Sequence, residues 1–128
     1  MKFNSQICTS RSQSERLLAL GLKRETSDMH HYKWSEGYWD IQACPVRGSE
    51  PYYIPAWSLH RLLSMLTYQV IYNGAKYEPV IALDGMAYQD VCTNDPVVGW
   101  SGNLYTDVID CIEWLIGQEQ FNPVYFGE

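Results

Sequence analysis

The amino-acid sequence predicts an α+β fold in which about three helices pack on a small antiparallel sheet. Apolar residues recur at helical spacing in separate stretches, and the dipeptides Asn73-Gly74 and Asp84-Gly85 are tight-turn signals between strand-like runs. Helical and strand-like runs do not alternate regularly, which favours α+β over α/β. With 128 residues, of which 46% are hydrophobic and 14% aromatic, residues 1–128 are expected to form one globular domain.

The first predicted helix covers residues 11–20. Ser12 followed by Glu15 fits a capping box, and Gly21 suits the left-handed position that ends a helix. A hairpin of strands 30–34 and 38–43 is expected next, because aromatic residues favour strands and a glycine lies in the short connection.

Residues 45–55 hold three prolines and are expected to form a loop. A second helix is predicted to begin near Pro55 or Ala56, because proline suits the first helical position. Four leucines follow at spacings of a helical stripe, namely Leu59, Leu62, Leu63 and Leu66.

A three-stranded meander is predicted after this helix. Its strands are residues 67–72, 76–83 and 86–92, joined by the two turn dipeptides. Pro79 interrupts the second strand, and because proline has no amide hydrogen we expect an edge position or a bulge there. Residues 96–102 are predicted to form a loop.

The last predicted helix covers residues 103–118, with Ser101 or Asn103 as its cap. Its apolar arc is wide, which is typical of a main core helix. We expect the tail beyond about residue 122 to be flexible.

The chain is acidic, with 9 Lys and Arg against 15 Asp and Glu and a net charge of −6. This balance disfavours nucleic acid as a partner, because non-specific binding depends on cations at phosphates. No apolar run is long enough for a signal peptide or a membrane span, so we expect a cytoplasmic protein without a membrane partner. The four cysteines form no Cys-x-x-Cys motif and are expected to be reduced, and neither a metal site nor a cofactor is predicted.

No catalytic motif is present, which favours a non-enzymatic protein. A small cysteine- or carboxylate-dependent enzyme stays an alternative, because a Cys–His pair meets in space and not in sequence. Asp107, Asp110 and Glu113 recur every three residues; such a ridge suits either a cation or acid–base site or, more commonly, a solvated helix face.

Two tryptophans do not fit the apolar stripes of their predicted helices. Trp57 lies off the leucine stripe, four residues before Arg61, and Trp114 falls beside Asp107 and Asp110. Two interpretations stay open: burial under other segments, which is common for large aromatics, or a contact surface for a protein partner or homodimer. Stacking of Trp57 on Arg61 would be a local explanation.

A second aromatic cluster is predicted around Tyr32, Trp34 and Trp39. Exposed aromatic platforms bind sugars and peptides, so this cluster predicts a small-molecule or peptide site with a cavity of ~300 Å³ or more. Packing in the core or on a sheet face is the structural alternative.

Three segments carry a resemblance to a known group of proteins: residues 7–30, 54–59 (IPAWSL) and 108–116 (VIDCIEWLI). They resemble short proteins encoded in prophages and integrative elements of gut bacteria, a group without an established activity. The resemblance implies a bacterial, mobile-element setting. The function expected from the whole sequence is a non-enzymatic interaction or accessory factor of a mobile element.

Overall fold

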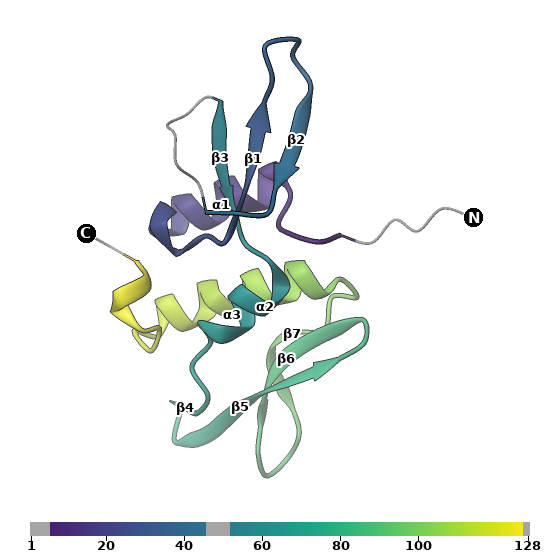
Figure 1. Cartoon of the computed structure of the whole chain (residues 1–128). Coiled ribbons are helices and arrows are strands. Elements are labelled where there is room, and N and C mark those ends of the chain that lie inside the picture. Colours follow the sequence, from purple (N-terminus) through teal and green to yellow (C-terminus); the bar gives the residue numbers. More distant parts are fainter. Residues whose placement is uncertain (1–5, 46–51, 127–128) are drawn as a thin grey trace. The chain divides into compact units, whose positions relative to one another are not determined.

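The computed structural model describes residues 6–45 and 52–126, and the chain divides into two compact units (Figure 1). Unit 1 consists of Met1–Leu62 and Val124–Glu128, and unit 2 consists of Leu63–Pro123. The described residues form three α-helices and two antiparallel sheets, so the predicted α+β class is confirmed. The sheets have three strands in unit 1 and four in unit 2.

The sheet of unit 1 has the strand order β2-β1-β3, and all its pairs are antiparallel. Its strands are β1 (Met29–Lys33), β2 (Trp39–Gln42) and β3 (Tyr53–Ala56). The first two form the hairpin that the sequence predicts. The third corrects two expectations, a loop through residue 55 and a helix from Pro55. Pro55 fits this strand because β3 lies at a sheet edge, where an amide hydrogen on the outer side is not needed.

Helix α1 (Arg11–Leu20) has the predicted bounds and packs against β3. Its cap differs from the prediction: Ser10 and Gln13 form the capping box, two residues earlier than Ser12 and Glu15. The predicted end is confirmed, since Gly21 has a left-handed φ of 106°. A short 3-10 helix, η1 (Arg24–Thr26), leads from here to β1.

Helix α2 (Leu59–Ser64) begins later than predicted because the residues around Pro55 belong to β3. Ser58 caps this helix, its hydroxyl accepting a hydrogen bond from the amide of Arg61 at 3.1 Å. The carboxylate of Asp28 in turn accepts bonds from the Ser58 amide at 2.9 Å and from its hydroxyl at 2.5 Å. The start of α2 is thus tied to the segment before β1.

The tail, for which we expected flexibility, contains a second 3-10 helix, η2 (Pro123–Tyr125). Within unit 1, the amide of Lys23 donates to the carbonyl of Tyr125 at 3.0 Å, and Phe126 forms a bridge with Leu22. The last two residues lie outside the described part of the chain.

The sheet of unit 2 has the order β4-β5-β6-β7. Its strands are β4 (Val70–Tyr72), β5 (Ala75–Ala82), β6 (Gly85–Asp90) and β7 (Pro96–Gly99). Strands β4, β5 and β6 confirm the predicted three-stranded meander. Strand β7 is a correction, because residues 96–102 were predicted to form a loop. At its end the amide of Trp100 donates to the carbonyl of Met86 at 3.0 Å.

Strand β4 is short and pairs only with Ala75–Tyr77. Within the described chain, the rest of β5 therefore has a strand partner on one side, β6, and forms an outer edge on the other. Pro79 lies in this stretch, which confirms the predicted edge position.

Helix α3 (Leu104–Gly117) packs against β6 and β7, one residue inside its predicted bounds at each end. Asn103 caps it by accepting a bond from the Thr106 amide at 2.9 Å, as one of the two predicted caps. Four aliphatic side chains on its apolar arc are fully buried: Val108, Ile109, Ile112 and Leu115. This agrees with the prediction of a main core helix.

Candidate functional site

One face of the β2-β1-β3 sheet carries a continuous set of aromatic rings. Side chains of a strand alternate between faces, and the register places Tyr32 opposite Tyr53 on one side and opposite Asp40 on the other. We call the side chains of this cluster the aromatic face; they are His30, Tyr32, Trp34, Tyr38 and Tyr53.

The rings of the aromatic face hold one another in place. The ring of Tyr32 lies 5.0 Å from that of Tyr53 and 4.9 Å from that of Trp34, at an angle of 86° to the latter. Trp34 stacks on Tyr38 at 6.2 Å and 25°. Edge-to-face and offset arrangements of this kind are favourable, so the set is ordered before any ligand arrives.

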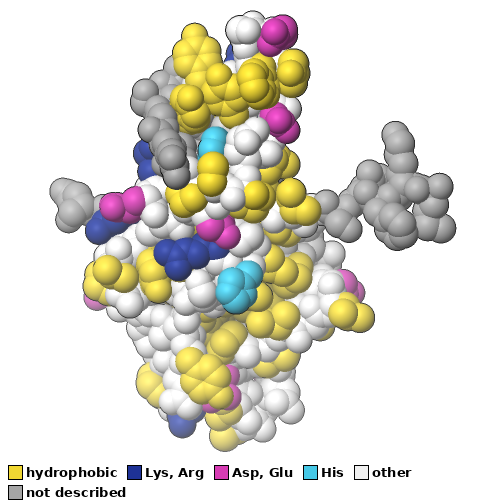
Figure 2. Space-filling view, in the orientation of Figure 1, with side chains coloured by type: hydrophobic (Ala, Val, Ile, Leu, Met, Phe, Trp, Pro, Cys, Tyr) yellow, Lys and Arg dark blue, Asp and Glu magenta, His cyan; other side chains and the backbone are white. Residues whose placement is uncertain are grey.

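A groove of about 600 Å³ opens beside these rings. Its lining residues come from β1, the turn after it and the start of the β3 segment, and they are Tyr32, Lys33, Trp34, Ser35, Glu36, Gly37 and Tyr52. Trp34 is 38% exposed and Tyr52 is 56% exposed, so large aromatic surfaces face solvent. Figure 2 shows hydrophobic side chains gathered over this end of the β1–β3 sheet. The volume is in the range of small-molecule and peptide sites.

The predicted cluster of Tyr32, Trp34 and Trp39 is brought together only in part. Trp39 is paired with Lys33 and lies on the opposite face, where the guanidinium of Arg11 is 4.5 Å from its ring centre. Directly paired residues share a face, and Lys33 points to the face opposite that of its neighbour Tyr32, so Trp39 does as well. Tyr52, which comes from the segment predicted as a loop, lines the groove in its place.

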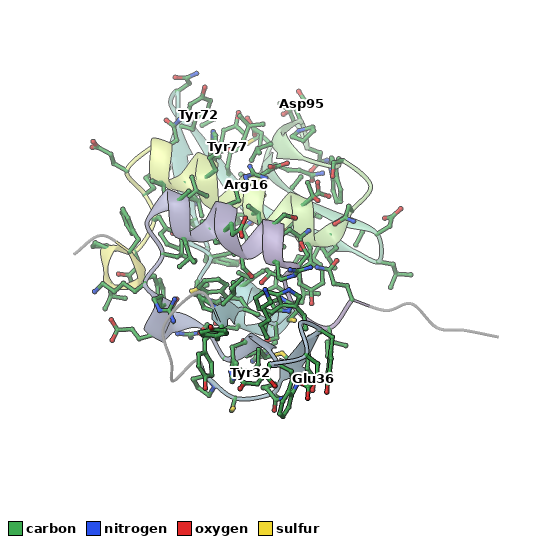
Figure 3. All side chains as sticks on the ribbon, turned by 90° about the horizontal axis from the view of Figure 1, so that it is seen from above. Arg16, Tyr32, Glu36, Tyr72, Tyr77 and Asp95 are labelled. Carbon is green, nitrogen blue, oxygen red and sulfur yellow. The ribbon has the colours of Figure 1, made fainter. Side chains whose placement is uncertain are left out.

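The groove also carries charge. Glu36 forms part of its wall and accepts a hydrogen bond from the Ser35 hydroxyl at 3.2 Å. In Figure 3, Glu36 and Tyr32 lie beside each other. Asp40 lies on β2 opposite Tyr32 and is exposed. Lys33 also lines the groove, but its ammonium lies 5.9 Å from the ring centre of Trp39, on the opposite face of the sheet.

Trp57, a predicted interaction residue, is part of the core. It is 0% exposed, and its indole nitrogen donates to the hydroxyl of Thr26 at 3.0 Å. Its backbone is bound from both sides by Thr9, whose hydroxyl accepts from the Trp57 amide and whose amide donates to the Trp57 carbonyl. The burial interpretation therefore applies to Trp57. Arg61 donates to the carbonyl of Thr26 at 2.7 Å and lies over Tyr125, in place of the stack expected on Trp57.

Trp114 lies in an aromatic cluster of unit 2 and is half-buried. Its ring centre is 5.5 Å from that of Tyr72, 6.1 Å from that of Tyr77 and 5.4 Å from that of Tyr88. Figure 3 labels Tyr72 and Tyr77, which come from the paired strands β4 and β5. A helix face that is polar in sequence thus packs against the sheet through its tryptophan.

Asp107 lies on the same side of α3 and is 0% exposed, so the interpretation as a solvated face is wrong for this residue. Its carboxylate accepts a bond from the Ser101 amide at 2.8 Å and one from the Met86 amide at 3.1 Å. Asp110 is half-buried and Glu113 exposed. Among the residues that the structure describes, no group of three His, Cys, Asp or Glu side chains is placed to hold a metal ion.

The buried thiols are poor nucleophiles. Burial, with a smaller effect of the negative charge of Asp28, raises the pKa of Cys8 to about 11. Burial and the nearby carboxylates of Asp107 and Asp110 raise the pKa of Cys111 to about 12. Both thiols are therefore protonated near neutral pH, which gives no support to thiolate catalysis at either position.

The two histidines of β1 are engaged with backbone carbonyls. The Nδ1 atom of His30 lies 2.9 Å from the carbonyl oxygen of Cys44, and the Nε2 atom of His31 lies 2.8 Å from that of Thr9. Because a carbonyl only accepts, these ring nitrogens donate. The cysteines Cys8, Cys44, Cys92 and Cys111 are all free thiols.

Comparisons with protein-family models, with curated proteins and with solved structures give no match for this chain. No helix in the described ranges has both the length and the apolar character needed to cross a membrane. The fold and the groove define a class, a small α+β protein with an open aromatic groove on a three-stranded sheet.

Proposed function

We propose that this protein is a non-enzymatic binding module whose aromatic groove holds a segment of another protein. The observation that carries the proposal is the exposure of Trp34 and Tyr52 in a groove of about 600 Å³. Exposed aromatic side chains that gather in one place mark interaction sites, because each offers a large apolar surface and a polar atom.

The exposed rings of the groove lie apart from the buried part of the sheet, which includes His30 on the aromatic face itself. On the opposite face, β3 contributes Ile54 and Ala56, both buried, and β1 contributes the buried His31. The core of unit 1 therefore does not use Trp34 or Tyr52. Since the rings already contact one another, binding would cost little side-chain entropy.

The same proposal includes a reducing compartment. Four free thiols, one of them exposed at Cys92, are typical of cytoplasmic proteins and support a cytoplasmic setting. An accessory role in a mobile element rests on the sequence resemblance alone and adds no residue to the groove.

The test is selection of a random peptide library displayed on phage against the immobilised full chain. Before selection, the library is depleted on the double variant Trp34→Ala/Tyr52→Ala. We expect clones that bind the wild type and the Tyr68→Ala variant, since Tyr68 is an exposed tyrosine of unit 2 outside the groove. Clones that bind the double variant as well as the wild type would contradict the proposal, and so would the absence of enriched clones.

A further inference from the structure

We infer that the groove is built for a proline-rich segment in the polyproline II conformation, with an arginine or lysine beside the prolines. The inference rests on the proposed function and names the ligand class of the same groove. Three features lead to it: the angles between the rings, the polar atoms that the rings present, and the charge at the wall.

Two rings that line the groove form a ridge rather than one flat platform, since Tyr32 and Trp34 stand at 86° to each other. The angle between these two rings leaves room for a proline ring to pack between them. Polyproline II segments are generally recognised in aromatic-lined grooves of this kind. A coplanar platform would suit the face of a sugar ring better.

The polar atoms of the groove complement a peptide that lacks amide hydrogens. Proline offers only carbonyl acceptors, so its recognition needs donors. The hydroxyls of Tyr32 and Tyr52 and the indole nitrogen of Trp34 are donors, and among the described residues none of the three has a hydrogen-bond partner. Tyrosine and tryptophan thereby supply both the apolar surface and the donors.

The charge of the wall favours a basic residue next to the prolines. Glu36 lines the groove, Asp40 lies on β2 opposite Tyr32, and the whole chain carries a charge of −6. An arginine that follows or precedes the prolines would reach Glu36, whereas the ammonium of Lys33 lies near Trp39 on the other face of the sheet. The same negative charge disfavours a phosphate-bearing ligand.

Fluorescence anisotropy of labelled peptides with the full chain tests the inference. The probes are eight prolines preceded by two arginines, the same prolines preceded by two glutamates, and a glycine–serine peptide preceded by two arginines. We expect the arginine–proline peptide to bind at least about ten-fold more tightly than the glycine–serine peptide. We expect the glutamate version to bind several-fold more weakly than the arginine version.

Three variants locate the binding. Trp34→Ala and Tyr52→Ala should each weaken the arginine–proline peptide about ten-fold or more, whereas Tyr68→Ala should not change its affinity. Glu36→Gln should weaken binding of the arginine–proline peptide and strengthen binding of the glutamate version, and so reduce the preference for arginine. Amide NMR spectra of each variant show whether unit 1 has kept its fold, so a loss of binding with a preserved spectrum is due to the removed ring.

Two results would overturn the inference: equal binding of the proline and glycine–serine peptides, or groove-dependent binding of the sugar oligomer cellohexaose in place of the proline peptides. In either case, phage clones that require Trp34 and Tyr52 would leave the proposed function standing. Without such clones, both would fail together.

Discussion

Replacing Asp107 by asparagine tests how a buried carboxylate holds the segments of unit 2 together. The carboxylate accepts from the amides of Met86 and Ser101, which belong to β6 and to the connection between β7 and α3. In Asp107→Asn one oxygen remains, so one amide keeps an acceptor while the other faces an NH₂ group. A hydrogen bond to a charged group contributes about 1.5–3 kcal/mol, and an unsatisfied buried donor costs about 1–3 kcal/mol.

We therefore expect Asp107→Asn to lower the free energy of unfolding by about 2–4 kcal/mol, a large part of the about 5–15 kcal/mol typical of a domain. Urea titration measures this loss, and hydrogen exchange at the amides of Met86 and Ser101 shows where protection disappears. Asp95→Asn is the matched control, because Asp95 is exposed in the same unit and should change stability by less than about 0.5 kcal/mol. If Asp107→Asn were as mild as this control, the carboxylate would not be what joins these segments.

The other predictions concern thiols, a buried indole and two glycines. At pH 8 a thiol reagent should modify the exposed Cys92 in the folded protein but Cys8 and Cys111 only after unfolding, and early labelling of either would contradict their burial. The pKa of the Cys8 thiol is raised from 9.0 to about 11 in the folded protein, so the thiol of the unfolded chain ionises at lower pH. The free energy of unfolding should therefore fall as pH rises from 9 to 11, and Cys8→Ala should make this fall smaller. Trp57→Phe removes the bond to Thr26 and should cost about 1–3 kcal/mol in urea titration; a neutral result would show that the hydroxyl finds another donor. Gly99→Ala should destabilise unit 2 far more than Gly37→Ala destabilises unit 1. Both glycines have positive φ, but a methyl group at Gly99 would meet the backbone of Met86 and Ala87, whereas at Gly37 it would meet open space. Equal melting temperatures of the two variants would contradict this.

Local signals in the sequence were sufficient for the elements that depend on local conformation. Asn73 and Gly74 both have positive φ, 50° and 79°, as their turn requires, and the strands on either side follow from that turn. Helix α1 ends at Gly21 for a similar reason. The backbone conformation at these positions follows from the residue types themselves and does not depend on what packs against them.

The strands β3 and β7 were missed because pairing with distant residues defines them. Both contain a proline and lie at a sheet edge, where a strand needs partners on one side only. Trp57 was judged by helical spacing, yet it lies between β3 and α2. A helical stripe does not apply there, so its burial could not be derived from the sequence.

The candidate site was predicted in composition but not in arrangement. Tyr32 and Trp34 lie in the groove as expected, while strand alternation sends Trp39 to the other face. For Asp107 the decisive donors come from segments 21 and 6 residues away in the sequence. Charge patterning on the helix alone contains no information about such donors.

The outer edge of β5 has a consequence for the behaviour of the protein at high concentration. In a hairpin closed by the two-residue turn after Ala82, the backbone groups of Pro79 and Ile81 point away from β6. Ile81 is 51% exposed and lies beside Val80 and Leu83, which are exposed as well, so this edge has the apolar character of a template for sheet growth between molecules. Pro79 interrupts the row of donors in the middle of the edge. Pro79 thus protects this edge against fibrous self-association. Pro79→Val would remove that protection while leaving the β5–β6 hairpin itself intact.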